Sequence, residues 1–145
     1  MGDIISFNGA FRFLSNFWPA TVTLDGVEYP TVEHAYQAAK TLDPDMRKVV
    51  REQLTPGKAK RLGFALSKRV DWTDVNLQIM FDLLVQKFTA DPLRQMLLDT
   101  GDAKLIEGNN WGDKHWGKVL EDGKWVGANH LGDLLMTIRE KLRGS

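Results

Sequence analysis

The stretch TVEHAYQAAK, residues 31–40, decides the fold expected around it. Thr31 follows a proline and carries the hydroxyl of a helix cap, so we expect a helix that runs to about Leu42. One stripe of this helix is made of valine and alanine, which are small enough to let other backbone approach closely. The adjoining face holds four polar side chains, those of Glu33, Tyr36, Gln37 and Lys40. The stretch therefore predicts a closely packed helix with a polar face.

Turn residues on both sides of this helix predict two β-hairpins. Aspartate followed by glycine favours the tight turn between antiparallel strands. The expected hairpins join Thr21–Leu24 to Val27–Tyr29 through Asp25-Gly26, and Val119-Leu120 to Trp125-Val126 through Asp122-Gly123. Short strands are also expected at Ile4–Phe7 and Ala103–Ile106, and an aromatic-rich loop at Phe11–Pro19.

Further helices are predicted by capping residues and by apolar spacing. A capping side chain followed by proline marks three helix starts, at Asp43-Pro44, Thr55-Pro56 and Asp91-Pro92. The longest helix should open at Asp71 or Thr73, and Asn129 should cap a final helix. Helices dominate, with a small antiparallel sheet, so the fold class is α+β. We expect one compact, helix-rich domain over residues 1–145.

Composition excludes several kinds of protein. The chain has 145 residues and no cysteine, which excludes disulfides, thiolate metal sites and a cysteine nucleophile. Lys+Arg and Asp+Glu are both 19, so the chain lacks the basic excess typical of proteins that hold long nucleic acids. Without a signal peptide or a long apolar run, we expect a cytoplasmic protein with no membrane segment, as a monomer or small oligomer.

The polar face of residues 33–40 is the first candidate for chemistry. Glu33 lies in the first helical turn, where the helix dipole favours the ionised carboxylate. Such a carboxylate suits a general base or a group that stabilises a cationic transition state. A solvated helix face would offer the same residue types, and this alternative stays open.

Two aromatic segments are further candidates. In Glu107–Gly117, a tryptophan beside Asp113 would form a wall for a flat ligand, although Trp111 and Trp116 would equally serve to pin the loop to the core. In Phe11–Trp18, four aromatic rings surround Arg12 and Asn16, which suits the binding of a base and a phosphate. A hydrophobic loop that closes over the sheet is the alternative there. The three histidines show no paired metal-ligand spacing, so no metal site is expected.

Four blocks in order resemble the NADAR (YbiA-like) superfamily, and together they span nearly the whole chain. The blocks are Phe13–Phe17, Val32–Lys40, Asp113-x-x-Trp116-Gly117 and Gly127-x-Asn129-x-Leu131-Gly132 with Leu135-Met136 and Arg139. The resemblance implies a compact α+β domain that cleaves N-glycosidic bonds. Family activities include the removal of ADP-ribose from guanine bases, which opposes a DNA-modifying toxin, and the hydrolysis of phosphorylated pyrimidine intermediates of riboflavin synthesis.

The resemblance also implies a set of site residues. Its polar reacting groups would be Glu33, Lys40 and Asp113. Substrate-binding residues would be Arg12, Asn16, Phe17, Tyr36, Gly117 and Asn129, with Trp72 and Trp116 as aromatic walls, although core packing is the alternative for Trp72. The implied substrate is ADP-ribose or ADP-ribosylated guanine in a nucleotide or DNA, the implied partner is an ADP-ribosyltransferase toxin encoded nearby, and no cofactor is implied.

Chemistry at these residues leaves two routes open. One carboxylate would stabilise the sugar cation while the other protonates the leaving nitrogen or activates water. Alternatively, Lys40 would capture the anomeric carbon as a Schiff base, which requires a lowered lysine pKa and would be helped by a nearby cation such as Arg12. A fully protonated Lys40 would instead bind phosphate. A protein that binds ADP-ribose or another NAD derivative without catalysis is the third hypothesis, although such a binder does not need all three reacting groups.

Overall fold

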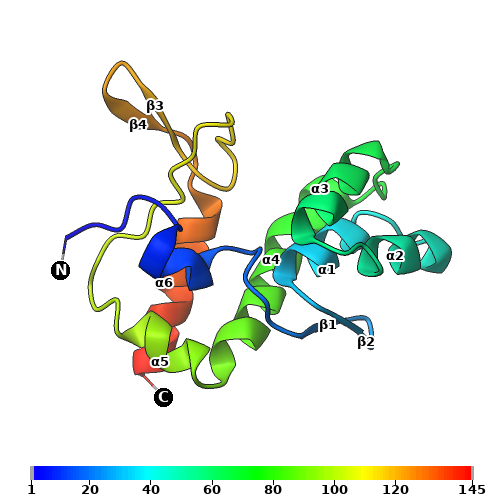
Figure 1. Cartoon of the computed structure of the whole chain (residues 1–145), viewed down its shortest axis with the longest axis horizontal. Coiled ribbons are helices and arrows are strands. Elements are labelled where there is room, and N and C mark those ends of the chain that lie inside the picture. Colours follow the sequence, from blue (N-terminus) through cyan, green and yellow to red (C-terminus); the bar gives the residue numbers. More distant parts are fainter. Residues whose placement is uncertain (1, 145) are drawn as a thin grey trace. The chain divides into compact units, whose positions relative to one another are not determined.

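The computed structural model describes residues 2–144 and places them in two compact units (Figure 1). Unit 2 comprises Asn16–Lys87, and unit 1 comprises the described residues before and after it. Unit 2 holds β1 (Val22–Leu24), β2 (Val27–Tyr29), α1 (Val32–Ala39), α2 (Pro44–Arg51), α3 (Pro56–Ala65) and most of α4 (Trp72–Thr89). Unit 1 holds the 3-10 helix η1 (Gly9–Leu14), α5 (Leu93–Leu98), β3 (Val119–Glu121), β4 (Lys124–Val126) and α6 (His130–Arg143).

The predicted α+β class is confirmed, with helices dominating and the strands in two hairpins. Each hairpin is a separate two-stranded antiparallel sheet, in which Val22 pairs with Tyr29 and Val119 pairs with Val126. Both turns use an aspartate and a glycine at positive φ, as the sequence predicts. Within the described residues 2–144, no helix is both long enough and apolar enough to cross a membrane.

Helix α1 is the centre of unit 2. The Thr31 hydroxyl accepts a hydrogen bond of 3.0 Å from the backbone N–H of His34, which confirms the predicted cap. The helix ends at Ala39 rather than near Leu42, because the groups that follow bond elsewhere. The carbonyl of Lys40 accepts from the N–H of Arg69 at 2.7 Å, and the Thr41 hydroxyl accepts from the N–H of Asp43 at 3.1 Å.

The neighbouring helices of unit 2 begin where their caps predict. Asp43 accepts from the N–H of Asp45 at the start of α2, and Thr55 accepts from the N–H of Lys58 at the start of α3. Helix α3 packs directly on α1 at Gly63, where an added Cβ would overlap the side chain of Gln37. This close approach of two helices needs a residue without a side chain.

The two short strands predicted in unit 1 are not formed. Ile4–Phe7 and Ala103–Ile106 meet in a single parallel bridge, in which Ile4 donates to Lys104 and accepts from Ile106, each at 2.8 Å. Beyond the bridge, the N–H of Gly108 turns back to the carbonyl of Ile106, so the pairing cannot extend. Local residue types favoured strands here, but the chain path allows only one pair.

Two other predictions for unit 1 differ from the structure, one for a loop and one for the start of a helix. The first half of the expected loop Phe11–Pro19 belongs to η1, which buries Phe13 and Leu14. Helix α5 begins at Leu93, after a cis peptide between Asp91 and Pro92, so this proline is not the first helical residue. The Asp91 carboxylate accepts instead from the N–H of Gln95 at 3.1 Å. Helix α6 buries Leu131, Leu135 and Ile138.

Candidate active site

The polar face of α1 is buried rather than solvated. Glu33 and Lys40 are each only 7% exposed, and every residue from Thr31 to Lys40 is buried. Lysine and glutamate are rarely buried to this extent unless a structural or chemical reason keeps them there. Their positions suit the helix dipole, since the carboxylate lies in the first turn and the amine follows the last. The solvated-face alternative is therefore wrong for this helix.

Glu33 is held from two directions within unit 2. The side-chain amide of Gln37 donates to Oε2 of Glu33 at 2.5 Å, and the backbone N–H of Glu33 donates to the carbonyl of Asn16 at 3.1 Å. Asn16 is itself buried, and its amide nitrogen lies 3.6 Å from the sulfur of Met80. A charged or polar group fixed in this way keeps one orientation, which a reacting carboxylate requires.

Two buried acceptor atoms adjoin this arrangement. Oδ1 of Asn16 and Oε1 of Gln37 have no hydrogen-bond partner among the described residues. A buried carbonyl oxygen without a partner loses free energy relative to one in water, so such atoms are rare in folded proteins.

Lys40 lies between two aromatic rings. Its Nζ is 5.9 Å from the ring centre of Tyr36 and 5.5 Å from that of Phe64 on α3. The Tyr36 ring in turn packs against the buried Trp72, with 5.1 Å between ring centres and an angle of 51°. Trp72 therefore contacts the candidate site through Tyr36 as a buried ring, and Phe64, which is 75% exposed, also borders Lys40.

Burial is the main reason that the pKa of Lys40 lies below its usual value. The positive charges of Lys68 and Lys60 lower this pKa further, and the carboxylate of Glu33 opposes them. The expected helper Arg12 is an exposed residue of η1 in unit 1, whereas the cations that act on Lys40 belong to unit 2. The lowered pKa favours a neutral amine, the form that attacks carbon.

A second group of predicted residues lies in unit 1, in the loop before β3. Oδ1 of Asp113 accepts from the backbone N–H groups of His115 and Trp116, at 3.0 and 2.9 Å. The half-buried Trp116 packs edge-on against the His115 ring, with 4.6 Å between ring centres. The ring centres of His115 and His130 are 4.7 Å apart. Asp113 therefore shapes the loop that presents this aromatic cluster.

Gly117 and Asn129 hold that loop to the start of α6. The Asn129 amide accepts from the N–H of Glu107 at 3.0 Å and donates to the carbonyl of Leu105 at 2.9 Å. Asn129 occupies the N-cap position with φ of 55°, but its side chain makes no capping hydrogen bond, so the predicted cap is wrong. At Gly117, an added Cβ would collide with Glu107.

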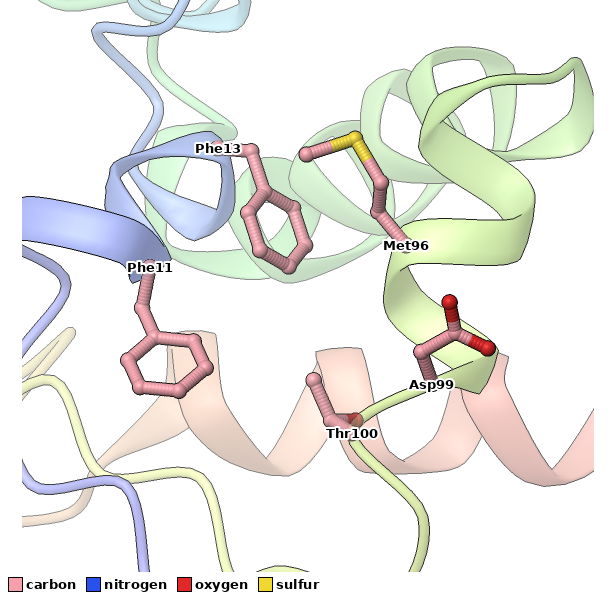
Figure 2. A pocket seen from close by; sticks show the side chains of 5 residues that line it. All are labelled: Phe11, Phe13, Met96, Asp99 and Thr100. Carbon is pink, nitrogen blue, oxygen red and sulfur yellow. The ribbon is translucent and has the colours of Figure 1, made fainter.

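Unit 1 also contains an apolar pocket of about 220 Å³ (Figure 2). Its walls are Phe11, Phe13, Met96, Asp99 and Thr100, of which Phe11 and Phe13 belong to the aromatic segment considered above for binding a base and a phosphate. The hydroxyl of Thr100 donates to Leu97 and accepts from Arg139, so the polar part of this wall is engaged in the fold. We therefore place the candidate chemistry at Glu33 and Lys40 rather than at this pocket.

Sequence reasoning missed Phe64, Lys60 and Lys68, all of which belong to unit 2. Lys60 and Phe64 are four residues apart on α3, a spacing that places them on one helix face. This spacing is visible in the sequence, but only the packing of α3 on α1 shows that the face borders Lys40. The remaining predicted residue of unit 2, Phe17, is 40% exposed, and its ring centre lies 6.0 Å from Nζ of Lys60.

Comparison with known proteins identifies the family to which the chain belongs. The NADAR domain family matches residues 6–143. The N-glycosidase YbiA of Escherichia coli (strain K12) is 41% identical over 133 residues, covering 88% of this chain and 79% of that protein. A riboflavin biosynthesis protein of Vibrio vulnificus is 36% identical over 134 residues, covering 90% of this chain but 35% of that protein. The NMR structure of E. coli YbiA superimposes with a TM-score of 0.81 at 36% identity, covering 99% of this chain and 84% of that chain. The chain belongs to the NADAR domain family.

Proposed function

We propose that this chain is an N-glycosidase, a hydrolase that cleaves the bond between a ribose carbon and a base nitrogen. The observation that carries the proposal is that a buried carboxylate in the first turn of α1, Glu33, acts electrostatically on a buried amine that follows the last turn, Lys40. A structural reason alone does not account for both groups, because burying a charge costs free energy that an apolar side chain would not. The relatives named as N-glycosidases support the same activity.

Glu33 fits the requirement of the bond that breaks. Cleavage of an N-glycosidic bond develops positive charge on the anomeric carbon and ring oxygen. A carboxylate that is already fixed by Gln37 stabilises this charge without having to reorganise during the reaction. The exclusion of water around Glu33 strengthens the interaction, because screening is weaker in a buried site.

Lys40 provides a covalent route. Ring opening of the glycosylamine breaks the bond between the anomeric carbon and the ring oxygen, moves the N–H proton to that oxygen and leaves an imine, to which the neutral lysine amine adds. The two protons of the lysine amine then pass in turn through Glu33 to the leaving nitrogen, the bond between that nitrogen and the anomeric carbon breaks, the base departs as its amine, and a lysine Schiff base remains. Water then adds to the Schiff base and regenerates the amine with release of the sugar aldehyde. The net reaction consumes one water and leaves the enzyme unchanged.

The substrate that we propose first is ADP-ribosylated guanine in a nucleotide or in DNA. The chain would then reverse the modification made by an ADP-ribosyltransferase toxin. The second candidate is a phosphorylated pyrimidine N-riboside. A specific observation favours it, since the relative from Vibrio vulnificus is named a riboflavin biosynthesis protein. Both substrates present a ribose joined to nitrogen and at least one phosphate.

Incubation of the protein with each substrate in parallel tests the proposal. Release of ADP-ribose from modified guanine is expected, and release from the pyrimidine riboside alone would replace the first substrate by the second. Tight binding of ADP-ribose without release from either would make the protein a binding module. Glu33→Gln, which is nearly the same size, should lose turnover while its thermal unfolding stays close to that of the wild type.

Borohydride reduction during turnover tests the role of Lys40. A Schiff base becomes a stable secondary amine on reduction, so mass spectrometry should find a ribose adduct on the peptide that contains Lys40. Lys40→Ala should abolish both the adduct and turnover, and Lys58→Ala, an exposed lysine of α3, should change neither. Absence of an adduct together with full activity of Lys40→Ala would remove the covalent route.

A further inference from the structure

The segment that contains α3 and the loop after it is strongly basic. Residues 53–70 contain no aspartate or glutamate, although the whole chain has equal numbers of acidic and basic side chains. Five basic residues occur there, namely Lys58, Lys60, Arg61, Lys68 and Arg69. Of these five, Lys60 and Lys68 act electrostatically on Lys40.

One stripe of α3 carries this charge to the edge of the Lys40 site. Gly57, Lys60 and Phe64 follow at spacings of three and four residues, which places them on one helix face. A Cβ at Gly57 would lie 3.9 Å from the Phe17 ring, and Nζ of Lys60 lies 6.0 Å from the centre of that ring. At the other end of the stripe, the Phe64 ring centre lies 5.5 Å from Nζ of Lys40.

Lys68 reaches the same place from the loop after α3. The backbone N–H of Arg69 donates to the carbonyl of Lys40 at 2.7 Å, which fixes the loop beside the end of α1. The guanidinium of Arg69 makes two hydrogen bonds to Asp71, at 2.6 and 3.0 Å. The exposed Lys68 has no carboxylate within ion-pair distance among residues 2–144. Its charge therefore acts on Lys40 without local compensation.

Two further amines, those of Lys60 and Lys68, therefore act on the Lys40 amine. The carboxylate of Glu33 opposes their effect on Lys40. Amines that are held close together repel one another, and the repulsion is relieved when an anion binds between them. Phosphate is suited to this role, because its oxygens accept short, charge-assisted hydrogen bonds from ammonium groups.

We propose that Lys60 and Lys68 bind a phosphate group of the substrate at the edge of the Lys40 site. The inference deepens the proposed function and rests on it for the identity of the reacting bond. It predicts selection for substrates that carry a phosphate close to the ribose. ADP-ribosylated guanine and a phosphorylated pyrimidine riboside both meet this condition, so phosphate binding explains how one arrangement accommodates either.

Kinetics with matched charge variants test the inference. Lys60→Gln and Lys68→Gln should each raise KM for the phosphorylated substrate about tenfold, the loss expected for one charge-assisted hydrogen bond. KM for the same substrate without its phosphate should not respond to either change. Lys58→Gln makes the same charge change on α3 at a lysine whose charge does not act on Lys40, and it should behave as the wild type. Equal effects on both substrates, or on none, would overturn the inference.

Binding measurements separate this inference from the reaction itself. Calorimetry with Glu33→Gln should show ADP-ribose binding that pyrophosphate displaces and that Lys60→Gln or Lys68→Gln weakens about tenfold. If no N-glycoside is cleaved but this binding pattern holds, the proposed reaction fails and the phosphate site stands. If cleavage occurs and the lysine variants bind normally, the phosphate site fails alone. Unmodified DNA serves as a further competitor. If it displaces ADP-ribose as effectively as pyrophosphate does, these lysines bind a nucleic acid backbone, and the inference is overturned.

Discussion

The side-chain amide of Gln37 donates a hydrogen bond of 2.5 Å to the Glu33 carboxylate, one helical turn earlier on α1. Gly63 of α3 makes room for this amide, because a Cβ there would overlap the Gln37 side chain. The position of the carboxylate thus depends on a glycine in a different helix.

Gly63→Ala should therefore damage both stability and activity. Overpacking at a buried contact costs about 1–3 kcal/mol, and the displaced Gln37 would no longer orient Glu33. Urea unfolding and turnover measure the two effects. Gly57→Ala is the control, since its Cβ would meet the nearest atoms at 3.9 Å, an ordinary contact. A Gly63→Ala variant with wild-type stability would show that α3 moves away from α1 without cost.

Phe64→Ala should shift the pH dependence of the reaction. The ring shields the Lys40 amine, and burial is the largest cause of the lowered pKa of Lys40. Removal of the ring admits water, so this pKa rises and a higher pH is needed to populate the neutral amine. The acidic limb of kcat/KM should move to higher pH in Phe64→Ala and stay in place in Leu54→Ala, another exposed apolar residue. An unchanged limb in both would mean that Lys40 does not set the pH profile.

Asp113 is tested by two substitutions that separate chemistry from loop structure. Asp113→Asn keeps the Oδ1 acceptor for the N–H groups of His115 and Trp116, whereas Asp113→Ala removes it. The alanine variant should lose about 1–2 kcal/mol of unfolding free energy, and the asparagine variant much less. If the carboxylate takes part in the reaction, Asp113→Asn should lose turnover without losing stability. Full turnover by that variant would leave Asp113 as a loop residue only.

Lys87 should make the stability of the protein rise with pH. This lysine of α4 is only 3% exposed, and burial lowers its pKa from 10.5 to about 7. Between these two values the unfolded chain binds a proton that the folded chain does not. The free energy of unfolding therefore increases with pH across this range, by at most about 1.4 kcal/mol per pH unit, and is lowest below it. Urea unfolding at a series of pH values should show this slope, Lys87→Met should reduce it, and Lys58→Met should not.

The features predicted from sequence are those set by neighbouring residues. Asp25-Gly26 forms its turn and Thr31 its cap because the groups that interact are a few residues apart. The strand predictions fail for the opposite reason. Ile4 and Leu105 are residues that favour strands. The number of residues that pair around them, however, depends on where two segments distant in sequence diverge.

The candidate site also combines features set by neighbouring residues with features set by residues distant in sequence. Glu33 and Lys40 follow from one helical stretch, so sequence spacing places them on one face. Phe64 and Lys68 come to that face only through the packing of α3 and its loop on α1. No local rule contains this information. Asn129 illustrates the limit at a single residue, because its type and position suit a cap while its amide bonds to Leu105 and Glu107 instead.

The complete burial of residues 31–40 has a consequence for how such a protein can change over evolutionary time. Amides of a buried segment exchange with solvent only when much of the surrounding structure opens, so those of α1 should exchange slowly. A substitution in α1 therefore changes the stability of the fold before it can change the substrate. The exposed side chains of α3 are free of that constraint. A lineage can thus acquire a new substrate by altering α3, while the reacting groups on α1 are inherited with the fold.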